Sequence, residues 1–427
     1  MGSIQALRGT RDILPEEVGY WQQVEAIARQ IFHKSAYREI RTPIFEPTEL
    51  FERGIGEATD VVGKEMYTFN DKATPPRSVT LRPEGTAGVV RAFIQNNLYA
   101  TGAVQRLWYT GPMFRYEKPQ AGRQRQFHQL GVEVIGSADP RADVEVIAIA
   151  TDILQTLGLK DLRLDINSVG NPEDRPLYRQ ALVDYLTPYK DELDPDSQDR
   201  LNRNPLRILD SKDKRTQKIV EAAPNLLDYL GSESRHHLEK VQQLLTDIGI
   251  TYQLNPRLVR GLDYYTHTAF EIQSDDLGAQ ATVCAGGRYD GLVAQLGGPD
   301  TPAVGWGLGI ERLILLLQQL STAPTSKLDL YLVSKGDAAE AQALKLAQKL
   351  RQAGFTVELD LSGSAFGKQF KRADRSGAVA CLVLGDAEAE SQTVNLKWLK
   401  SGEQKAIAQS ELLENPDELR RQLDSVT

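Results

Sequence analysis

Cysteine is almost absent from this chain, and its scarcity excludes two kinds of site. Only Cys284 and Cys381 occur among 427 residues, far apart and in unlike contexts. Two such residues build neither a disulfide framework nor a thiolate metal site, so we expect a reducing, cytoplasmic compartment. The five histidines show no spacing typical of zinc ligands either. The sequence therefore leaves any metal ligands unknown.

Long hydrophobic runs and targeting signals are also missing. The longest apolar run, near Leu313 to Leu317, is far too short to span a bilayer. The first residues, Met1 to Ala6, lack the Ser or Thr at position six that a myristoylation signal needs, and no signal-peptide core follows them. We therefore expect no membrane partner.

Basic residues are outnumbered: 50 Lys and Arg stand against 58 Asp and Glu, which gives a formal net charge of -8. This balance argues against wholesale, non-specific binding of nucleic acid, although a local basic patch remains open. The length, with 41% hydrophobic residues, is enough for two or three domains with sizeable cores.

The most informative segment that is present runs from Met113 to Gly136. It predicts the end of one strand, a basic loop rich in Gly and Pro, and a returning strand. Arginines can grip phosphate or carboxylate groups bidentately, and the returning strand supplies acceptors. A solvated hairpin tip is the alternative for the loop alone. The residues that predict an anion pocket are Arg115, Glu117, Arg123, Arg125, His128, Gln129 and Glu133.

Neighbouring antiparallel strands predict an α+β sheet and argue against a doubly wound nucleotide fold. Residues 37–47 alternate like an edge strand, and residues 258–272 also have a strand pattern. The polar block between about 171 and 250 predicts an inserted helical subdomain. Beyond a linker near residues 321–327, alternating strands and helices predict a small α/β domain with a mostly parallel sheet. The expected domains are residues 1–325 and 326–427.

Two further clusters are compatible with ligand binding. In Gly305-x-Gly307-x-Gly309 the spacing is wrong for a dinucleotide fingerprint. The glycines would permit close backbone approach to a flat group, with Arg312 reaching a phosphate, although tight helix packing is the alternative. Arg260 precedes Tyr264 and Tyr265; on a regular strand the two tyrosines would lie on opposite faces. An arginine near two phenols suits a small carboxylate-bearing ligand, and a structural tyrosine pair is the alternative.

The remaining charged features are more ambiguous. Basic residues at i, i+3, i+4 and i+7 predict one stripe on a C-terminal helix, where like charges repel unless an anion meets them. A solvated face is the alternative to RNA binding. Among the histidines, His237 is expected at the surface, and His267 is expected on a strand near the candidate site. The stripe comprises Lys368, Lys371, Arg372 and Arg375.

Together these segments resemble the class II aminoacyl-tRNA synthetases and, within them, the histidyl-tRNA synthetase family. The segment around Pro43 is similar to motif 1, which lies at the dimer interface in that class. Residues 114–133 resemble motif 2, and residues 305–312 resemble motif 3. Residues 260–265 and 285–291 are similar to two histidine-specific signatures, and residues 8–15 and 368–374 also match family segments. The resemblance covers nearly the whole chain.

The resemblance implies an enzyme that activates L-histidine with ATP and Mg²⁺ and transfers it to tRNA(His), as a cytoplasmic homodimer. Its catalytic residues would be Arg260 and Arg115. The histidine site would comprise Glu84, Thr86, Arg115, Gln129, Glu133, Arg260, Tyr264 and Tyr265. The ATP site would comprise Arg115, Glu117, Arg123, Phe127 and Arg312. The tRNA contacts would be Arg123, Arg125, Lys368, Lys371, Arg372 and Arg375.

Three rival functions remain at this level. A non-catalytic regulatory subunit of ATP phosphoribosyltransferase resembles the synthetase core, but generally lacks the anticodon-binding domain that this chain retains. A class II synthetase of another amino-acid specificity would leave the two histidine signatures without purpose. An RNA-binding scaffold without catalysis would not need Arg260.

Overall fold

The computed structural model describes residues 3–56, 59–259, 262, 264–276, 282–320, 322–323 and 327–426. The chain divides into two compact units, residues 1–323 and residues 324–427. The division lies two residues from the expected boundary. Each unit has its own hydrophobic core.

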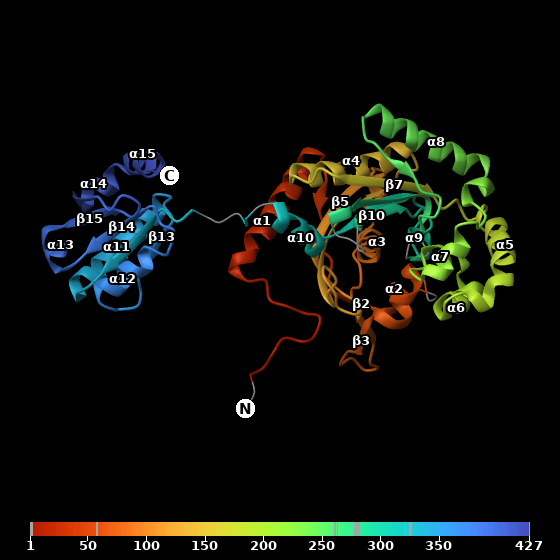
Figure 1. The fold of residues 1–427 in the computed structure, drawn as a ribbon, viewed down its shortest axis with the longest axis horizontal. Helices are drawn as coiled ribbons and strands as arrows, with labels where there is room; N and C mark the ends of the chain where they lie inside the picture. Colours follow the sequence, from red (N-terminus) through yellow and green to blue (C-terminus); the bar gives the residue numbers. More distant parts are fainter. Residues whose placement is uncertain are drawn as a thin grey trace. The chain divides into compact units, whose positions relative to one another are not determined.

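An eight-stranded sheet forms the centre of the first unit, in the order β1-β5-β6-β11-β10-β9-β7-β8 (Figure 1). Only the two outermost pairs are parallel, so the sheet is largely antiparallel. The predicted hairpin is confirmed as its longest antiparallel pair. The strands are β1 (Arg38–Glu39), β5 (Gln105–Phe114), β6 (Gln126–Ile135), β7 (Leu162–Ser168), β8 (Gln253–Leu254), β9 (Thr266–Ser274), β10 (Thr282–Arg288) and β11 (Ala303–Gly309).

Helices cover both faces of this sheet because its strands alternate their side chains. Trp108 of β5 belongs to one core cluster, whereas its neighbours Leu107 and Tyr109 belong to the other. The first cluster packs under α1 (Pro15–Lys34), α4 (Pro140–Thr156), α8 (Ser232–Asp247) and α10 (Ile310–Leu320). The second includes residues from α3 (Thr86–Gln95) and α9 (Leu292–Gln295).

A small second sheet lies beside the large one in the same unit, in the order β2-β4-β3. The expected single strand over residues 37–47 is wrong: its start is β1 of the large sheet and its end is β2 of the small sheet. Pro43 lies between them and has no N–H to donate to a ladder. The elements of this region are β2 (Phe45–Pro47), α2 (Thr48–Ile55), η1 (Val61–Glu65), β3 (Tyr67–Asn70), β4 (Ser78–Leu81) and η2 (Leu98–Thr101).

A helical segment separates the adjacent strands β7 and β9, as the polar composition predicts. It has its own buried leucines and tyrosines, including Tyr178, Leu182 and Leu201. We call residues 175–247 the helical insertion. Besides α8, its elements are α5 (Arg175–Leu186), η3 (Thr187–Glu192), α6 (Pro195–Arg203), η4 (Pro205–Asp210), α7 (Lys214–Val220) and η5 (Leu226–Tyr229).

The second unit is an α/β domain with a five-stranded sheet in the order β13-β12-β14-β15-β16. Its first three strands are parallel, but β15 and β16 pair antiparallel, so the expectation of a mostly parallel sheet is wrong. The elements are β12 (Leu330–Ser334), α11 (Asp337–Gln352), β13 (Val357–Leu359), α12 (Phe366–Ala373), β14 (Ala380–Leu384), α13 (Asp386–Ser391), β15 (Thr393–Trp398), β16 (Gln404–Ala408), α14 (Gln409–Glu414) and α15 (Pro416–Val426).

Candidate active site

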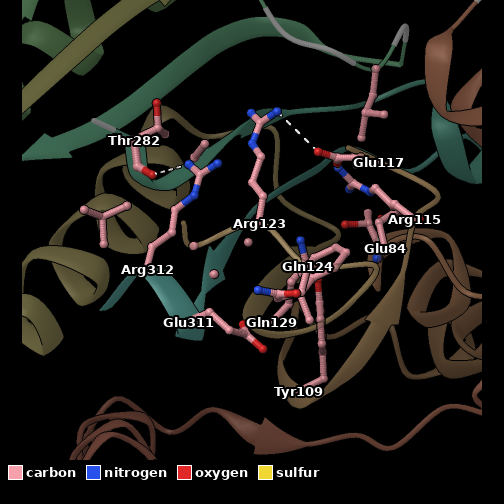
Figure 2. A pocket seen from close by; sticks show the side chains of 18 of the residues that line it. Glu84, Tyr109, Arg115, Glu117, Arg123, Gln124, Gln129, Thr282, Glu311 and Arg312 are labelled. Atoms are coloured by element: carbon pink, nitrogen blue, oxygen red, sulfur yellow. Dashed lines mark hydrogen bonds and ion pairs between the residues drawn. The ribbon is translucent and has the colours of Figure 1, made fainter. Parts of the chain in front are cut away.

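A cavity of about 280 Å³ opens on the large sheet, and segments that are far apart in the sequence line it. They are the start of α3, the β5–β6 hairpin, the residues that precede β9, the first residues of β10, and β11 with its junction to α10. Figure 2 shows arginines gathered at one side of this cavity and Tyr109 with Gln129 at the other. The sequence-predicted segments therefore meet in one pocket.

The arginine half of the pocket is held by ion pairs with Glu117. Arg123 Nη1 lies 3.2 Å from Glu117 Oε2, and Arg115 Nη1 lies 3.8 Å from Glu117 Oε1. Arg115 also donates from Nε to the carbonyl oxygen of Pro83 at 2.8 Å, and its guanidinium lies 5.4 Å from the centre of the Phe127 ring. These groups are partly solvent-exposed, so a polyanion can reach them and compete with Glu117.

Arg312 completes the arginine half from the first turn of α10. Its Nη1 donates to the carbonyl oxygen of Thr282 at 2.6 Å. Burial, together with the charge of Arg123, lowers the pKa of Arg312 to about 10, so the guanidinium remains charged at neutral pH. Beside it, both Glu311 oxygens accept from the His128 backbone N–H at 2.9 Å. His128 thus anchors α10 to β6.

The tyrosine half is buried and consists mainly of hydroxyl and carboxyl groups. Tyr264 and Tyr265 both line the cavity, with ring centres 4.7 Å apart. The expected strand over these residues is wrong, because β9 begins only at Thr266 and both tyrosines precede it. Without strand alternation the two rings share the pocket side. Arg260, the predicted catalytic residue, lies outside the described residues.

Glu84 and Thr86 enter this half from the N-terminus of α3. The Glu84 carboxylate accepts the backbone N–H groups of Thr86 at 2.7 Å and Ala87 at 2.8 Å, which satisfies donors that a helix end leaves open. Burial nevertheless raises the pKa of Glu84. Gln129 reaches the same cavity from β6 and lies 3.4 Å from the position that a Cβ on Gly307 would occupy.

Glu133 lies beneath the cavity wall and does not line the cavity itself. Its side chain is 0% exposed, and three hydroxyl groups donate to it. Thr86 Oγ1 donates to Oε1 at 2.7 Å, Tyr109 donates to the same oxygen at 3.4 Å, and Tyr289 donates to Oε2 at 2.5 Å. Burial is the largest effect on the Glu133 pKa, and the net result is a rise to about 8. Glu133 can therefore change protonation near neutral pH.

The glycine of β11 nearest to this carboxylate serves packing. A Cβ on Gly305 would lie 1.9 Å from Glu133 Oε2 and 2.3 Å from the Val132 carbonyl oxygen, so only glycine fits. Gly307 and Gly309, in contrast, line the cavity. Gly305 thus permits close packing of β11 on β6, and the binding role expected for the motif stays a prediction.

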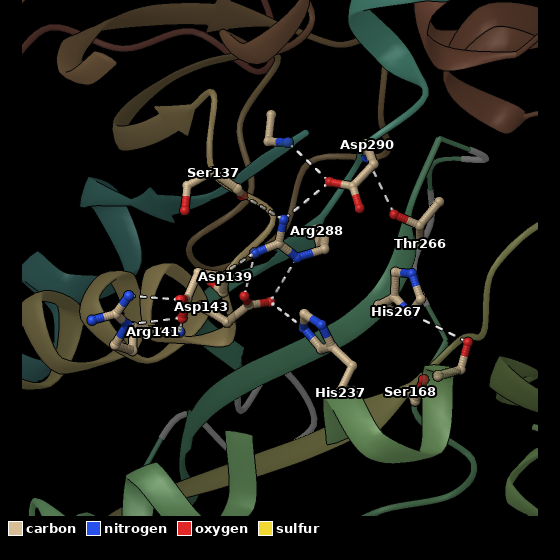
Figure 3. Close-up of polar contacts among 12 residues, drawn as sticks. Ser137, Asp139, Arg141, Asp143, Ser168, His237, Thr266, His267, Arg288 and Asp290 are labelled. Carbon is tan, nitrogen blue, oxygen red and sulfur yellow. Dashed lines mark hydrogen bonds and ion pairs between the residues drawn. The ribbon is translucent and has the colours of Figure 1, made fainter. Parts of the chain in front are cut away.

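Sequence reasoning missed Tyr109 and Tyr289 as parts of the site. Tyr289 lies between Arg288 and Asp290 at the end of β10, and a buried ion pair fixes this turn (Figure 3). Arg288 and Asp143 are both 0% exposed; Nε donates to Asp143 Oδ1 at 3.2 Å, and a second bond joins Nη2 to Oδ2. Removing one partner of such a pair would leave an uncompensated buried charge. Arg288, Tyr289 and Asp290 belong to one short signature. Arg288 and Asp290 fix the turn, and this turn places Tyr289 beside Glu133.

Two histidines belong to this ion-pair network. The expectation that His237 lies at the surface is wrong: its side chain is 12% exposed, and Nε2 lies 3.4 Å from Asp143 Oδ1. His267 is buried and stacks on His237 with ring centres 5.0 Å apart. It does not line the cavity. The cause in both cases is the packing of α8 against the start of β9, which a local pattern does not reveal.

The predicted tRNA contacts occupy three different kinds of place. Arg125 does not line the cavity; its guanidinium stacks on Tyr116 at 3.7 Å, and its backbone N–H donates to the Gly9 carbonyl at 2.7 Å. In the second unit, Lys368 and Lys371 are exposed on α12. Arg123, the third kind of contact, lines the cavity itself.

The predicted four-residue stripe on this helix is wrong in two respects. Arg375 lies beyond the last helical residue, Ala373. Arg372 is neutralised by Asp360, which accepts from Nε at 2.8 Å and from Nη2 at 3.0 Å. Burial alone would raise the pKa of Asp360, but the hydrogen bonds from Arg372, Ser362 and Tyr331 together hold it well below its usual range. The end of β13 brings this carboxylate to the helix, which sequence spacing alone could not indicate.

A largely antiparallel eight-stranded sheet with an arginine-lined polar cavity, in a chain that also carries a separate α/β unit, defines a class II aminoacyl-tRNA synthetase. Residues 9–173 and 189–313 match the family described as Histidyl-tRNA synthetase, and residues 329–418 match the family described as Anticodon binding domain. The chain belongs to the histidyl-tRNA synthetase family. The predicted family and fold class are therefore confirmed.

Individual relatives and structures agree with this assignment. The chain is 74% identical over 424 residues to a protein of Gloeothece citriformis named histidine--tRNA ligase, covering 99% of this chain and 98% of the relative. A Synechocystis protein of the same name is 71% identical over 423 residues, covering 99% and 94%. The crystal structure of apo histidyl-tRNA synthetase from S. aureus has a TM-score of 0.80 and 41% identity, covering 96% and 99%. These similarities favour the synthetase over the regulatory alternative.

Proposed function

We propose that this chain activates L-histidine with ATP to form histidyl-adenylate and then transfers the histidyl group to tRNA(His). The observation that carries the proposal is the single cavity in which arginines face buried tyrosines and carboxyl groups. Membership of the histidyl-tRNA synthetase family supports it across nearly the full length.

The arginine half would hold ATP during activation. The histidine carboxylate attacks the α-phosphorus, and negative charge moves onto the departing pyrophosphate. Arg115 is assigned to the α-phosphate, with Arg123 and Arg312 at the β and γ phosphates. Phe127 would support adenine and Glu117 would lie near its amino group, so ATP would displace the ion pairs that Glu117 now makes. No covalent enzyme intermediate is required.

The tyrosine half would read the amino acid. Glu84, Thr86 and Gln129 are assigned to the α-ammonium group, because all three line the cavity. Tyr264 and Tyr265 would border the imidazole. Glu133 would act from beneath by fixing the hydroxyl groups of Thr86, Tyr109 and Tyr289. A ligand lacking ring nitrogens would leave polar groups of the cavity lining unpaired. Arg260 would orient the histidine carboxylate, by resemblance to the family alone.

Mg²⁺ would enter the site as part of the ATP complex. Among the described residues no group of three or more His, Cys, Asp or Glu side chains could hold a metal ion. Mg²⁺ keeps several waters and takes one or two carboxylates together with substrate phosphates. Glu311 lines the cavity beside Arg312 and is the carboxylate we assign to this role. The ion would supply charge neutralisation at the phosphates.

The tRNA would contact both units of the chain. We assign residues 1–325 as catalytic domain with an insertion at about 171–250, and residues 326–427 as anticodon-binding domain. Lys368 and Lys371 of α12 would meet the anticodon side, and Arg123 and Arg125 the acceptor end. Arg372 and Arg375 remain assigned to this surface, although Arg372 is paired with Asp360. Such contacts make tRNA affinity fall steeply with salt.

The enzyme is further proposed to act as a cytoplasmic homodimer. The segment that resembles motif 1 exposes Ile44 and Phe45, which are 44% and 60% exposed in the single chain. Two adjacent exposed apolar side chains next to the edge strand β1 are compatible with a protein interface. Among the described helices, none is long and apolar enough to cross a membrane.

The proposal is tested by ATP–pyrophosphate exchange, followed by charging of purified tRNA. Exchange must require histidine and fail with the other amino acids; its absence in folded protein would exclude the enzyme. In a second step, Lys368→Glu/Lys371→Glu should raise the KM for tRNA about tenfold while exchange stays unchanged. An unchanged KM would remove α12 from the tRNA interface.

A further inference from the structure

The segment that precedes α1 resembles a family segment, yet the proposed function gives it no role. Most of this segment is exposed: the Leu7 side chain is 79% exposed, and Arg8 is exposed as well. Gly9 differs from them, because it is buried. We call residues 7–11 the N-terminal turn, since the N–H and hydroxyl groups of Thr10 both donate to the Leu7 carbonyl oxygen, at 2.9 and 2.8 Å.

Gly9 bonds to the β5–β6 hairpin just beyond its last strand pair. The last paired residues of the hairpin are Phe114 and Gln126. One residue further, the Arg115 N–H donates to the Arg125 carbonyl oxygen at 2.9 Å, and the Arg125 N–H donates to the Gly9 carbonyl oxygen at 2.7 Å. The Gln126 N–H approaches the same Gly9 oxygen at 3.3 Å. The main chain of Arg125 therefore links Gly9 to Arg115.

Close contact with the Arg125 side chain makes glycine the residue that fits at position 9. Gly9 has a φ of +88°, and a Cβ there would lie 2.7 Å from Arg125 Cγ and 2.8 Å from Cδ. Arg125 is itself held in place, because its guanidinium stacks on the Tyr116 ring at 3.7 Å and its Nε donates to the Glu117 carbonyl oxygen at 3.3 Å. A side chain at position 9 would displace either the N-terminal turn or Arg125.

The other end of the N-terminal turn is fixed to α1. Arg11 and Glu17 form an ion pair with two hydrogen bonds, from Nη1 to Oε2 at 2.6 Å and from Nη2 to Oε1 at 2.5 Å. Glu17 also accepts from Trp21 Nε1 at 3.2 Å, and the Trp21 ring meets the His128 ring of β6 edge-on with centres 4.9 Å apart. The turn is thus anchored to the same sheet that carries the hairpin.

The hairpin loop that the turn contacts carries arginines of the candidate active site. Arg115 and Arg123 line the cavity at the two ends of this loop. A loop that is ordered beforehand binds its ligand more tightly, because ordering it on binding costs affinity. We infer that Gly9 is a positioning residue, which holds the Arg125 main chain and thereby fixes Arg115 and Arg123 for the ATP phosphates. The inference rests on the proposed function and adds a residue to its ATP half.

The first test measures the hairpin loop in the full-length protein and does not depend on activity. Gly9→Ala is compared with Gly158→Ala, a position that also has a left-handed backbone, at φ +93°, but has nothing within 4 Å of a Cβ. Amide hydrogen exchange of residues 115–126, followed by mass spectrometry, should become about tenfold faster in Gly9→Ala and stay unchanged in Gly158→Ala. Equal protection of this segment in both variants would overturn the inference.

The second test measures ATP–pyrophosphate exchange with the same two variants. Gly9→Ala should raise the KM for ATP about tenfold and the KM for histidine by about twofold at most, because the loop carries the arginines assigned to the phosphates. Gly158→Ala should leave both constants unchanged, although each substitution strains the backbone and lowers the midpoint of thermal unfolding. If Gly9→Ala raises both constants equally, or raises neither, Gly9 does not position the ATP half.

A double substitution tests the contact between Gly9 and Arg125 itself. Arg125→Ala removes Cγ and Cδ, leaves Cβ at 3.1 Å from a Cβ at position 9, and keeps the main-chain N–H. In this background Gly9→Ala should raise the KM for ATP only about twofold, compared with about tenfold in wild type. The same factor in both backgrounds would refute the contact. Failure of the proposed function would look different: wild-type protein would show no histidine-dependent ATP–pyrophosphate exchange, while the difference in amide hydrogen exchange would persist.

Discussion

The two halves of the candidate active site differ in how their charged groups are solvated and paired. In the arginine half, Arg115 and Arg123 are partly exposed and paired with Glu117, so their charges stay hydrated until a ligand arrives. In the tyrosine half, Glu133 is fully buried and is satisfied by hydroxyl groups. The first half offers strong charge to a polyanion, and the second offers fixed hydrogen-bond directions to a small polar ligand.

This difference indicates which half supplies charge for ligand binding and which half supplies selectivity between ligands. Exposed ion pairs are exchanged at little cost, so the arginine half can accept triphosphate and release pyrophosphate. Buried hydroxyl–carboxyl contacts are costly to leave unmade, so the tyrosine half can discriminate between amino acids of similar size. Substitutions in the two halves should therefore have different kinetic signatures.

The largest effect is expected from Arg115→Ala. If Arg115 stabilises the charge that develops at the α-phosphate, exchange should fall about 10³-fold, mostly in kcat. Arg125→Ala is the matched control from the same hairpin, because Arg125 stacks on Tyr116 outside the cavity. Steady-state exchange kinetics check both variants. Equal losses would show that the hairpin matters as a whole and that the cavity does not single out Arg115.

The next effect in size is expected from Glu133→Gln. The amide keeps the shape of the side chain but cannot accept from Thr86, Tyr109 and Tyr289 in the same way. We expect kcat/KM for histidine to fall about 100-fold, with the KM for ATP nearly unchanged. Exchange measured at varied histidine, and then at varied ATP, gives both values. A larger effect on ATP than on histidine would reverse the assignment of the two halves.

A smaller effect should follow Tyr289→Phe, which removes only the hydroxyl that donates to Glu133 Oε2. One lost hydrogen bond to a buried carboxyl group predicts about a tenfold lower kcat/KM for histidine. Tyr178→Phe is the control: this buried tyrosine donates to the Pro224 carbonyl at 3.1 Å in the helical insertion. Comparable kinetic losses in both variants would indicate general destabilisation instead of a specific role.

The smallest effect concerns stability and pH. The folded state raises the Glu133 pKa from 4.5 to about 8, so between these values it binds more protons than the unfolded state. The contribution of Glu133 to stability is thus fully present below about pH 4.5 and is lost as pH rises through about 8. The amide in Glu133→Gln does not titrate, so this variant does not lose that stability as pH rises. Relative to wild type, its midpoint of thermal unfolding should rise by about 2–4 °C between about pH 5.5 and about pH 9. A constant difference would show that Glu133 does not titrate in this range.

The sequence predicted the arginine half better than the tyrosine half, for a physical reason. Arg115, Glu117 and Arg123 lie on one hairpin, where strand period and loop length determine which groups come together. The hairpin and the helical insertion were likewise predictable from local patterns. Tyr109 and Tyr289 were not, because 180 residues separate them and only the order β5-β6-β11-β10 brings both to Glu133.

Other errors have the same origin in contacts between distant segments. The strand pattern before Thr266 gave way to an irregular segment that places both tyrosines on one side of the pocket. Arg372 met Asp360 from another element, and His237 met Asp143 of α4. Each of these contacts joins two different elements, whereas periodicity describes only the faces of one element.

The central claim, that one half of the pocket holds ATP and the other reads histidine, is tested most directly by two Michaelis constants measured in one exchange assay. Arg123→Gln and Glu133→Gln are compared with wild type. We predict a crossover: Arg123→Gln raises the KM for ATP about tenfold and leaves that for histidine unchanged, and Glu133→Gln does the reverse. If both variants raise both constants by similar factors, the pocket does not have two functional halves.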